Sequence, residues 1–158
     1  MRSVRSPRPL TKAQKPHELM KTIFIPSLAA LVIGSAVADK TVTSQTLCCA
    51  TASWDGTCLP AYGTGQPEIT IKRITIPPGT SLPMHKHPVI NAGVLLRGTL
   101  AVETEEGKKL VLKAGDPIIE VVDHWHRGTN VGAEPAEIIV FYAGTVGDPL
   151  TVKKTPKK

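Results

Sequence analysis

The feature that most constrains the fold is a series of short strand-forming segments separated by turns. They cover residues 68–76, 92–97, 99–104, 109–113, 117–122 and 136–143. No stretch between residues 39 and 158 shows sustained helical periodicity with caps. Exposed strand edges invite aggregation, and closing the sheet protects them. We therefore predict an all-β fold, a small antiparallel barrel or double-sheet jelly roll, over residues 67–145.

One segment interrupts its own alternation of apolar and polar residues. Isoleucines at 69 and 71 are followed by the pair Lys72-Arg73, after which isoleucines return at 74 and 76. An extra residue in one strand shifts its side chains to the other face. We therefore expect a bulge or bend at Lys72-Arg73.

Charge is concentrated at the two ends of the chain. The formal net charge is +6, but residues 39–152 hold nine Lys and Arg against twelve Asp and Glu. This central part is mildly acidic and offers no basic surface for nucleic-acid phosphates. The lysines near the carboxyl end predict a solvated, disordered basic tail over residues 146–158.

The amino-terminal region predicts export. Residues 20–38 combine a lysine, a short apolar run and a small-residue ending, the pattern of a secretory signal peptide, and cleavage is expected after Ala38. The apolar run contains Pro26 and Gly34 and is shorter than the about 20 residues that span a bilayer, so we expect no stable membrane anchor after cleavage. Residues 1–19 are expected to be a disordered upstream extension. The mature protein is predicted to be periplasmic or secreted.

Export gives the three cysteines a context. Cys48, Cys49 and Cys58 lie in residues 39–66, which we expect to be loop-rich with one weak strand. Disulfides persist in exported proteins, and adjacent cysteines rarely pair with each other. We therefore predict a bridge from Cys58 to either Cys48 or Cys49, with one thiol left free.

Two histidines separated by one residue provide the first chemical signal. On an extended strand alternate side chains share a face, so His85 and His87 lie on one face with Asn91 and Leu95. Imidazole is a common metal ligand, and two imidazoles on one strand can bind one ion when a third donor comes from elsewhere. His126 is the candidate for that third donor.

The residues around the first two histidines resemble a sequence motif of the cupin superfamily. They read Gly79-x5-His85-x-His87-x3-Asn91-x6-Gly98. The family pattern is G-x5-H-x-H-x3,4-E-x6-G. Every position matches except the glutamate, which is replaced by Asn91.

The residues around His126 resemble the second motif of the same superfamily. They read Gly115-x5-Val121-x-Asp123-x2-His126-x3-Asn130, against G-x5-P-x-G-x2-H-x3-N in the family. Valine and aspartate replace the proline and the second glycine. Asn130 is expected to bond to the backbone at the turn after the strand. The resemblance covers roughly residues 68–143.

The resemblance implies a double-stranded β-helix barrel in which His85, His87 and His126 bind one divalent transition metal, namely Fe, Mn, Ni, Cu or Zn. The fourth cupin ligand is a carboxylate, which this chain lacks at Asn91. Asn91 therefore either contacts the ion weakly through its carbonyl oxygen or lies beside the ligands. His124 is either a fourth imidazole ligand or a residue at the rim. An ion held by neutral ligands alone should be retained less tightly and should favour an anionic co-ligand.

The surroundings of the site are less specific. Leu95, Trp125 and Tyr142 are candidates for the wall of a substrate pocket, although an aromatic residue in a barrel more often belongs to the core. Glu120 and Asp123 are the nearest acidic residues in sequence, but we expect neither to act as a general base beside the site. Proton-abstraction chemistry is therefore disfavoured.

Cupins host several kinds of reaction, so fold alone does not give function. Our first hypothesis is an exported metal-binding cupin that acts as a dioxygenase-type oxidoreductase on a small metal-chelating substrate, as cupin dioxygenases of quercetin or thiols do. The alternatives are a non-catalytic module that binds a metal or small ligand and a structural jelly roll with a vestigial site. Residues 136–143 could form a homodimer by strand exchange or sheet packing.

Overall fold

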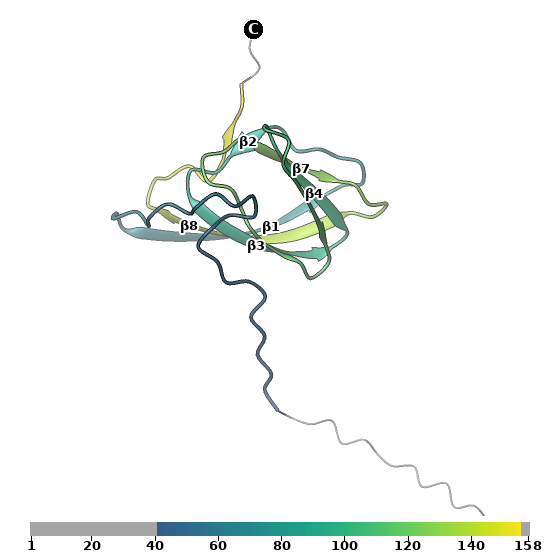
Figure 1. Cartoon of the computed structure of the whole chain (residues 1–158), viewed down its shortest axis with the longest axis horizontal. Coiled ribbons are helices and arrows are strands. Elements are labelled where there is room, and N and C mark those ends of the chain that lie inside the picture. The colour runs from purple at the N-terminus through teal and green to yellow at the C-terminus, as the bar shows by residue number, and fades with distance from the viewer. Residues whose placement is uncertain (1–40, 156–158) are drawn as a thin grey trace, which may run out of the picture. The chain divides into compact units, whose positions relative to one another are not determined.

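The structure, a computed structural model, describes residues 41–155, which form two antiparallel sheets (Figure 1). The first sheet has the order β1-β8-β3-β6, with β1 (Pro67–Ile76), β8 (Ala136–Thr145), β3 (Ile90–Arg97) and β6 (Pro117–Ile119). The second has the order β5-β4-β7-β2-β9, with β5 (Lys109–Lys113), β4 (Thr99–Thr104), β7 (His126–Asn130), β2 (His85–Lys86) and β9 (Val152–Lys153). The prediction of an all-β jelly roll is confirmed.

The predicted upstream extension, residues 1–19, and the predicted signal peptide, residues 20–38, lie outside the described residues. Between residues 41 and 155 no helix has the length and apolar character needed to cross a membrane.

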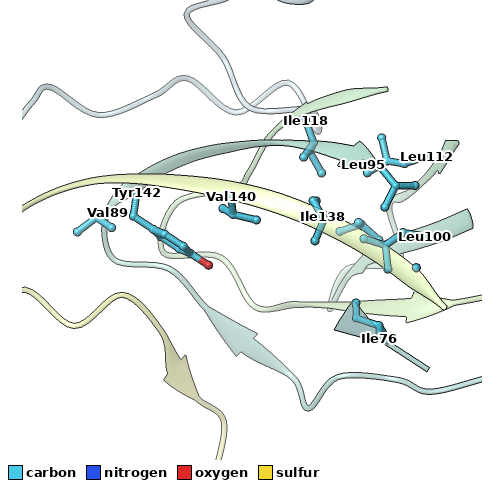
Figure 2. Packing of buried hydrophobic residues seen from close by; sticks show 11 residues of the cluster. Ile76, Val89, Leu95, Leu100, Leu112, Ile118, Ile138, Val140 and Tyr142 are labelled. Carbon is cyan, nitrogen blue, oxygen red and sulfur yellow. The ribbon is translucent and has the colours of Figure 1, made fainter. Parts of the chain in front are cut away.

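Apolar side chains from both sheets fill one part of the barrel interior (Figure 2). Leu95 of β3 and Ile138 of β8 pack in one buried cluster with Leu100 of β4 and Leu112 of β5. Along β4 every second residue is buried, as the side-chain period of a strand requires. Burial of one such aliphatic side chain is worth about 1.5–3 kcal/mol, so this cluster holds the two sheets together.

A single glycine joins β3 to β4. Gly98 has a φ of +81°, and a Cβ there would lie 2.7 Å from the Cα of Ala136. Only glycine combines this left-handed backbone with such a close approach. The glycine that ends the first motif is therefore required by the chain's passage from one sheet to the other.

The expected bulge at Lys72-Arg73 is wrong. β1 pairs with β8 in unbroken register, from Pro67 opposite Thr145 to Ile76 opposite Ala136. The strand keeps its alternation by turning Ile69 and Ile71 outward, where they are 51% and 63% exposed. The irregularity in this sheet lies instead in β3, between Leu95 and Arg97.

The first histidine motif is divided between the two sheets rather than lying on one strand. His85 belongs to β2, whereas Asn91 belongs to β3 in the other sheet, with Pro88 in the connection. Alternation of burial continues through the connection, because His85, His87, Val89 and Asn91 are all buried. These side chains therefore point into the same interior but come from two sheets, instead of sharing one face of one strand.

Two ends of predicted elements differ from the structure. The expected strand 117–122 ends at Ile119, where the chain leaves the ladder toward Asp123, whose φ is +57°. The expected disordered tail from residue 146 instead folds back: β9 pairs with β2, and the Lys154 amide donates to the Met84 carbonyl at 2.9 Å. Backbone hydrogen bonds along the β2 edge order this segment despite its basic composition.

The segment before β1 forms a small hairpin rather than a disulfide-linked loop. Ala52 pairs with Cys58 in an isolated antiparallel bridge, and Cys48 and Cys49 lie outside it. All three cysteines are free and exposed, so the predicted bridge is not formed in this structure.

The segment suggested for dimerisation is central in its sheet. β8 pairs with β1 along one edge and with β3 along the other, which leaves no free edge for strand exchange. Its outer face, where Phe141 is exposed opposite Ile71, stays available for packing.

Candidate metal centre

Three histidines converge inside the barrel. His85 of β2 and His126 of β7 are directly opposite each other in the ladder, and His87 follows β2. One ring nitrogen of each lies within 4.8 Å of one from each of the others. His85, His87 and His126 are 9%, 5% and 1% exposed, respectively. The structure thus brings together the three residues that the two motifs placed apart in sequence.

Backbone carbonyls orient all three imidazoles. The Nδ1 atoms of His85, His87 and His126 lie 2.7, 2.7 and 2.9 Å from the carbonyl oxygens of Pro83, Leu150 and His124. A carbonyl oxygen only accepts hydrogen bonds, so each Nδ1 carries the proton and each Nε2 presents a lone pair. This tautomer is the one required of an imidazole that binds a metal through Nε2.

Burial keeps these imidazoles neutral. It lowers the pKa of His85 and of His126, and it lowers the pKa of His87 to about 4, although the backbone hydrogen bond of each ring acts in the opposite direction. The neighbouring imidazoles lower the pKa of His87 further by charge repulsion. Neutral imidazoles are the form that binds metals.

Two oxygen-bearing side chains complete the polar part of the interior. Asn91 donates from Nδ2 to the Val89 carbonyl at 3.2 Å, and its Oδ1 is buried without a partner. Glu120 lies beside it, with Oε2 at 3.7 Å from Nε2 of His126. Burial raises the pKa of Glu120 to about 7, an effect that His85 reduces.

Glu120 was not expected at the site, and its presence there is a correction. From sequence alone Glu120 has no expected role, because the strand pairing that brings it beside Asn91 is not visible in the motif. The alternation of side chains does indicate an inward position for Glu120, because Ile118, two residues earlier, is buried. An acidic residue at an inward position of a strand is a marker of a functional site.

The unsatisfied atoms in this part of the barrel fit a metal ion. Among the described residues, four buried side-chain polar atoms lack a hydrogen-bond partner, and three of them belong to Asn91, Glu120 and His126, which line one cavity. Buried polar atoms are normally paired, since an unpaired one costs free energy. Imidazole nitrogen and carboxylate oxygen together are a donor set suited to a divalent transition metal.

The cavity that holds these groups has a volume of about 210 Å³ and is mainly apolar. Tyr142 lines it and is buried, and burial raises the pKa of its hydroxyl to about 12. Leu95 lies outside it, in the apolar cluster. Trp125 also lies outside it, with the ammonium groups of Lys86 and Lys154 each 5.6 Å from its ring centroid.

The remaining motif residues have structural roles. His124 is outside the three-imidazole group, and its carbonyl orients His126. Asn130 donates to the carbonyls of Ile76 and Glu134 and accepts from the Gly132 amide, which confirms its expected backbone role. Asp123 takes the left-handed conformation at the motif's glycine position, which Asp tolerates better than most residues.

Comparison with known proteins supports the fold. A family model described as a cupin domain matches residues 72–142. A search of the curated proteins finds no match. A DMSP lyase from Ruegeria pomeroyi is similar in structure, with a TM-score of 0.50 and 21% identity over 57% of this chain and 45% of that chain.

Two further solved structures have lower scores. A conserved Klebsiella pneumoniae protein with a double-stranded β-helix domain has a TM-score of 0.47 and 21% identity, over 61% of this chain and 90% of that chain. An oxalate decarboxylase from Lactobacillus farciminis has a TM-score of 0.47 and 19% identity over 54% of this chain, which spans only 26% of that enzyme. At such identities these likenesses concern the fold alone. The matched cupin model and the two-sheet barrel built around both motifs identify residues 72–142 of this chain as a cupin domain.

Proposed function

We propose that this protein is an exported metal-binding cupin that acts as a metal-dependent, dioxygenase-type oxidoreductase on a small metal-chelating substrate. The observation that best supports metal binding is the orientation of His85, His87 and His126, whose Nδ1 atoms all lie within hydrogen-bonding distance of backbone carbonyls. Their Nε2 lone pairs are therefore free to bind one ion without a change of tautomer. Iron, manganese, nickel, copper and zinc all accept imidazole ligands, so the donor set does not choose among them.

The cavity supports a small ligand beside the ion. Its volume, about 210 Å³, is smaller than that of ordinary ligand pockets, which begin at about 300 Å³, so any ligand it holds is small. Val102, Ile138 and Val140 give it apolar walls. A bound transition metal supplies Lewis acidity and, when redox-active, electron transfer to a chelated substrate.

Two lysines support an anionic substrate. Lys153 lines the cavity, and the Lys72 ammonium lies 5.8 Å from the Tyr142 ring centroid. The positive charge of Lys72 also acts in the direction that lowers the pKa of His87, as the smallest of its causes. A carboxylate or enolate chelator would meet both the ion and these positive charges.

A second function is favoured by the depth of the site. His126 is almost completely buried, and the cavity is small, which suits a module that holds a metal or small ligand without turnover. Retention of a redox-inert ion with no oxygen consumption would favour this module. Retention of a redox-active ion, with oxygen uptake on addition of small hydroxy acids, enols or thiols, would favour the oxidoreductase.

The experiment that tests metal binding is elemental analysis of the full chain purified without a His-tag. A His85→Ala/His126→Ala variant serves as the comparison. We expect one transition metal ion per chain, lost in the variant, because the variant keeps a single imidazole. No metal in either protein after anaerobic reconstitution would overturn the proposal.

Export is tested separately. The predicted signal peptide, residues 20–38, should be absent from the mature protein, so mass spectrometry of protein from the periplasm or medium should find a chain that begins at Asp39. Recovery of the intact chain from the cytoplasm alone would contradict export without affecting the metal proposal.

A further inference from the structure

We propose that Glu120 is a fourth protein ligand of the metal and that it replaces, from the end of a different strand, the carboxylate that the first motif lacks at Asn91. This inference rests on the proposed metal site and concerns one residue outside both motif patterns. It changes the expected centre from three neutral ligands to three neutral ligands and one anion.

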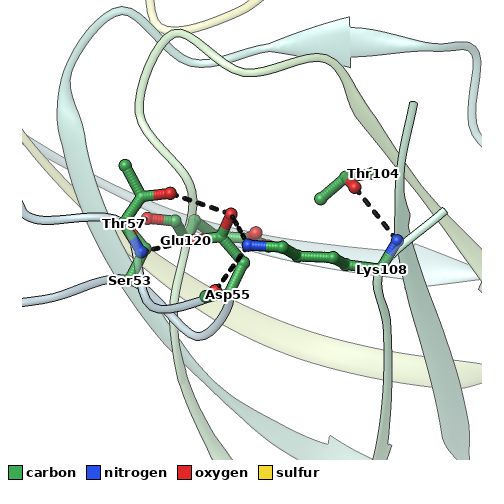
Figure 3. A network of polar contacts seen from close by, with 6 residues as sticks. All are labelled: Ser53, Asp55, Thr57, Thr104, Lys108 and Glu120. Carbon is green, nitrogen blue, oxygen red and sulfur yellow. Dashed lines mark hydrogen bonds and ion pairs between the residues drawn. The ribbon is translucent and has the colours of Figure 1, made fainter. Parts of the chain in front are cut away.

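The backbone places Glu120 next to Asn91. Its amide donates to the Asn91 carbonyl at 3.0 Å, so the two residues are neighbours across the β3–β6 pairing. On its other side, the Glu120 carbonyl accepts a hydrogen bond from Ser53 Oγ at 2.8 Å (Figure 3). The hairpin that contains Ser53 is attached at a second point, where the Trp54 amide donates to the Ile119 carbonyl at 2.9 Å. The main chain at Glu120 is thus held from both sides.

The Glu120 carboxylate lies beside one of the three imidazoles, that of His126. Its Oε2 lies 3.7 Å from Nε2 of His126, and both atoms are buried and lack a hydrogen-bond partner. Two donors bound at about 2.0–2.2 Å from one ion are separated by at most about 4.4 Å, so the observed distance allows both to bind the same ion. Nε2 of His126 is also the atom that its tautomer leaves free for metal binding.

A purely structural role for Glu120 does not explain its surroundings. Glu120 is 8% exposed, and a buried carboxyl group in a structural role would be hydrogen-bonded or paired with a cation. The Trp54 indole lowers the pKa of Glu120, but its Nε1 makes no hydrogen bond of normal geometry. A metal ion would satisfy Oε2.

The charges of the residues that line the cavity also favour Glu120 as a metal ligand. The three imidazoles are neutral, as is the Asn91 amide, and Glu120 is the one acidic residue among those that line the cavity. A divalent ion there would otherwise have no negative protein ligand. A bound cation strongly favours the ionised form of a carboxylate beside it, so Glu120 would be an anionic ligand.

The test is metal affinity in the full-length protein, measured by competition titration of Co²⁺ and Zn²⁺ against a chromophoric chelator. The variants are Glu120→Gln, which keeps shape but removes charge, and Asn91→Glu/Glu120→Gln, which returns the carboxylate to the family position. The matched control is Glu103→Gln, because Glu103 is a partly exposed acid outside the cavity that pairs with Lys109 and Arg127. The visible spectrum of the Co²⁺ protein reports the donor set independently of any activity.

Loss of a residue that only orients a metal ligand weakens metal binding about 10- to 100-fold. We expect Glu120→Gln to weaken binding by at least this much and to change the Co²⁺ spectrum. The double variant should recover most of the affinity, while Glu103→Gln should match the wild type. Recovery in the double variant also shows that any loss in Glu120→Gln is not misfolding.

Two outcomes would overturn the inference in different ways. Unchanged affinity and an unchanged Co²⁺ spectrum in Glu120→Gln, with binding abolished in His85→Ala, would leave the three-histidine site and remove Glu120 from it. No binding of either ion by the wild type would remove the metal site itself, and the inference with it.

Discussion

The two parts of the barrel interior differ in how fully their buried atoms are satisfied by neighbours. Around Leu95, Leu100 and Leu112 the inward side chains are apolar and buried in one cluster. Around His126 and Glu120 the inward side chains are polar, equally buried and without partners for key atoms. The first part stabilises the fold, whereas the second lowers stability until something binds there.

This difference separates what makes the chain fold from what makes it function. Natural proteins depart from rules of core packing mainly at functional sites. Here the departure involves positions on β2, β3 and β7 and the residues directly after β2 and β6. Changes in the apolar part should therefore affect stability without altering metal affinity, and changes in the polar part should do the reverse.

The largest stability effect is expected from Leu95→Ala. Leu95 is fully buried, and truncation of a buried leucine costs about 2–5 kcal/mol through lost contacts and the cavity that remains. Chemical denaturation of the metal-free protein should show this loss, while the affinity for Co²⁺ stays within about 3-fold of wild type. A large loss of affinity in a folded Leu95→Ala protein would break the separation of the two parts.

The next effect is a gain in stability. The pKa of Glu120 is raised by burial from 4.5 to about 7. Below pH 4.5 the Glu120 carboxyl is protonated in both the folded and the unfolded state. Between pH 4.5 and about 7 only the unfolded state releases the proton, so the metal-free wild type loses stability as pH rises. Glu120→Gln lacks this loss. Its stability advantage should grow to as much as about 3 kcal/mol at neutral pH and above.

Chemical denaturation of both proteins in chelator at several pH values measures this difference. The histidines, whose pKa values are lowered, act in the opposite direction by removing stability as pH falls, but they are common to both proteins. A stability difference between the two proteins that does not change with pH would show that the Glu120 carboxyl is not buried as described.

The carboxyl-terminal segment should have a smaller effect, on metal affinity. The Leu150 carbonyl orients His87, and β9 pairs with β2 beside it. A chain that ends at residue 149 should bind Co²⁺ about 10- to 100-fold less tightly, because orienting partners of metal ligands contribute that much. A chain that lacks only residues 156–158 is the control and should bind as wild type. Equal affinity in both truncated chains would show that this segment does not position His87.

The smallest effect is expected from Asp55→Asn. Asp55 accepts hydrogen bonds from the Thr57 amide and hydroxyl, each at 2.9 Å, and pairs with Lys108 at 3.4 Å. Burial raises the pKa of Asp55, but these bonds outweigh it and lower the pKa overall. The variant should lose about 1 kcal/mol near neutral pH, and less as pH falls below 3.8. A thermal-shift series across pH checks both the size and the trend.

Much of the fold could be predicted from local sequence, because turns and strand-forming segments are encoded locally. The hairpin of β4 and β5 has its predicted bounds, and the glycines of the motifs at 79, 98 and 115 all have positive φ. Errors arose where tertiary contacts override local pattern. The outward isoleucines of β1 and the ordered tail through Lys154 both depend on neighbouring strands that no local pattern shows.

The candidate site was predictable only in part. The spacing of His85, His87 and His126 indicated that they would meet, and the structure brings them together. Glu120 was missed because its proximity to Asn91 depends on the pairing of β3 with β6, which are separated in sequence by two other strands. The Leu150 carbonyl was missed because a backbone atom leaves no trace in a sequence motif.

The most direct measurement is anomalous diffraction from crystals of the full chain grown with Co²⁺ or Mn²⁺. We expect one strong peak at about 2.0–2.2 Å from the Nε2 atoms of His85, His87 and His126, with a Glu120 oxygen in the same coordination shell. A peak bound by the three histidines alone, with Glu120 turned away, would retain the metal centre and contradict the fourth ligand. No peak at the three histidines at saturating metal would contradict the account of the polar interior as a metal site.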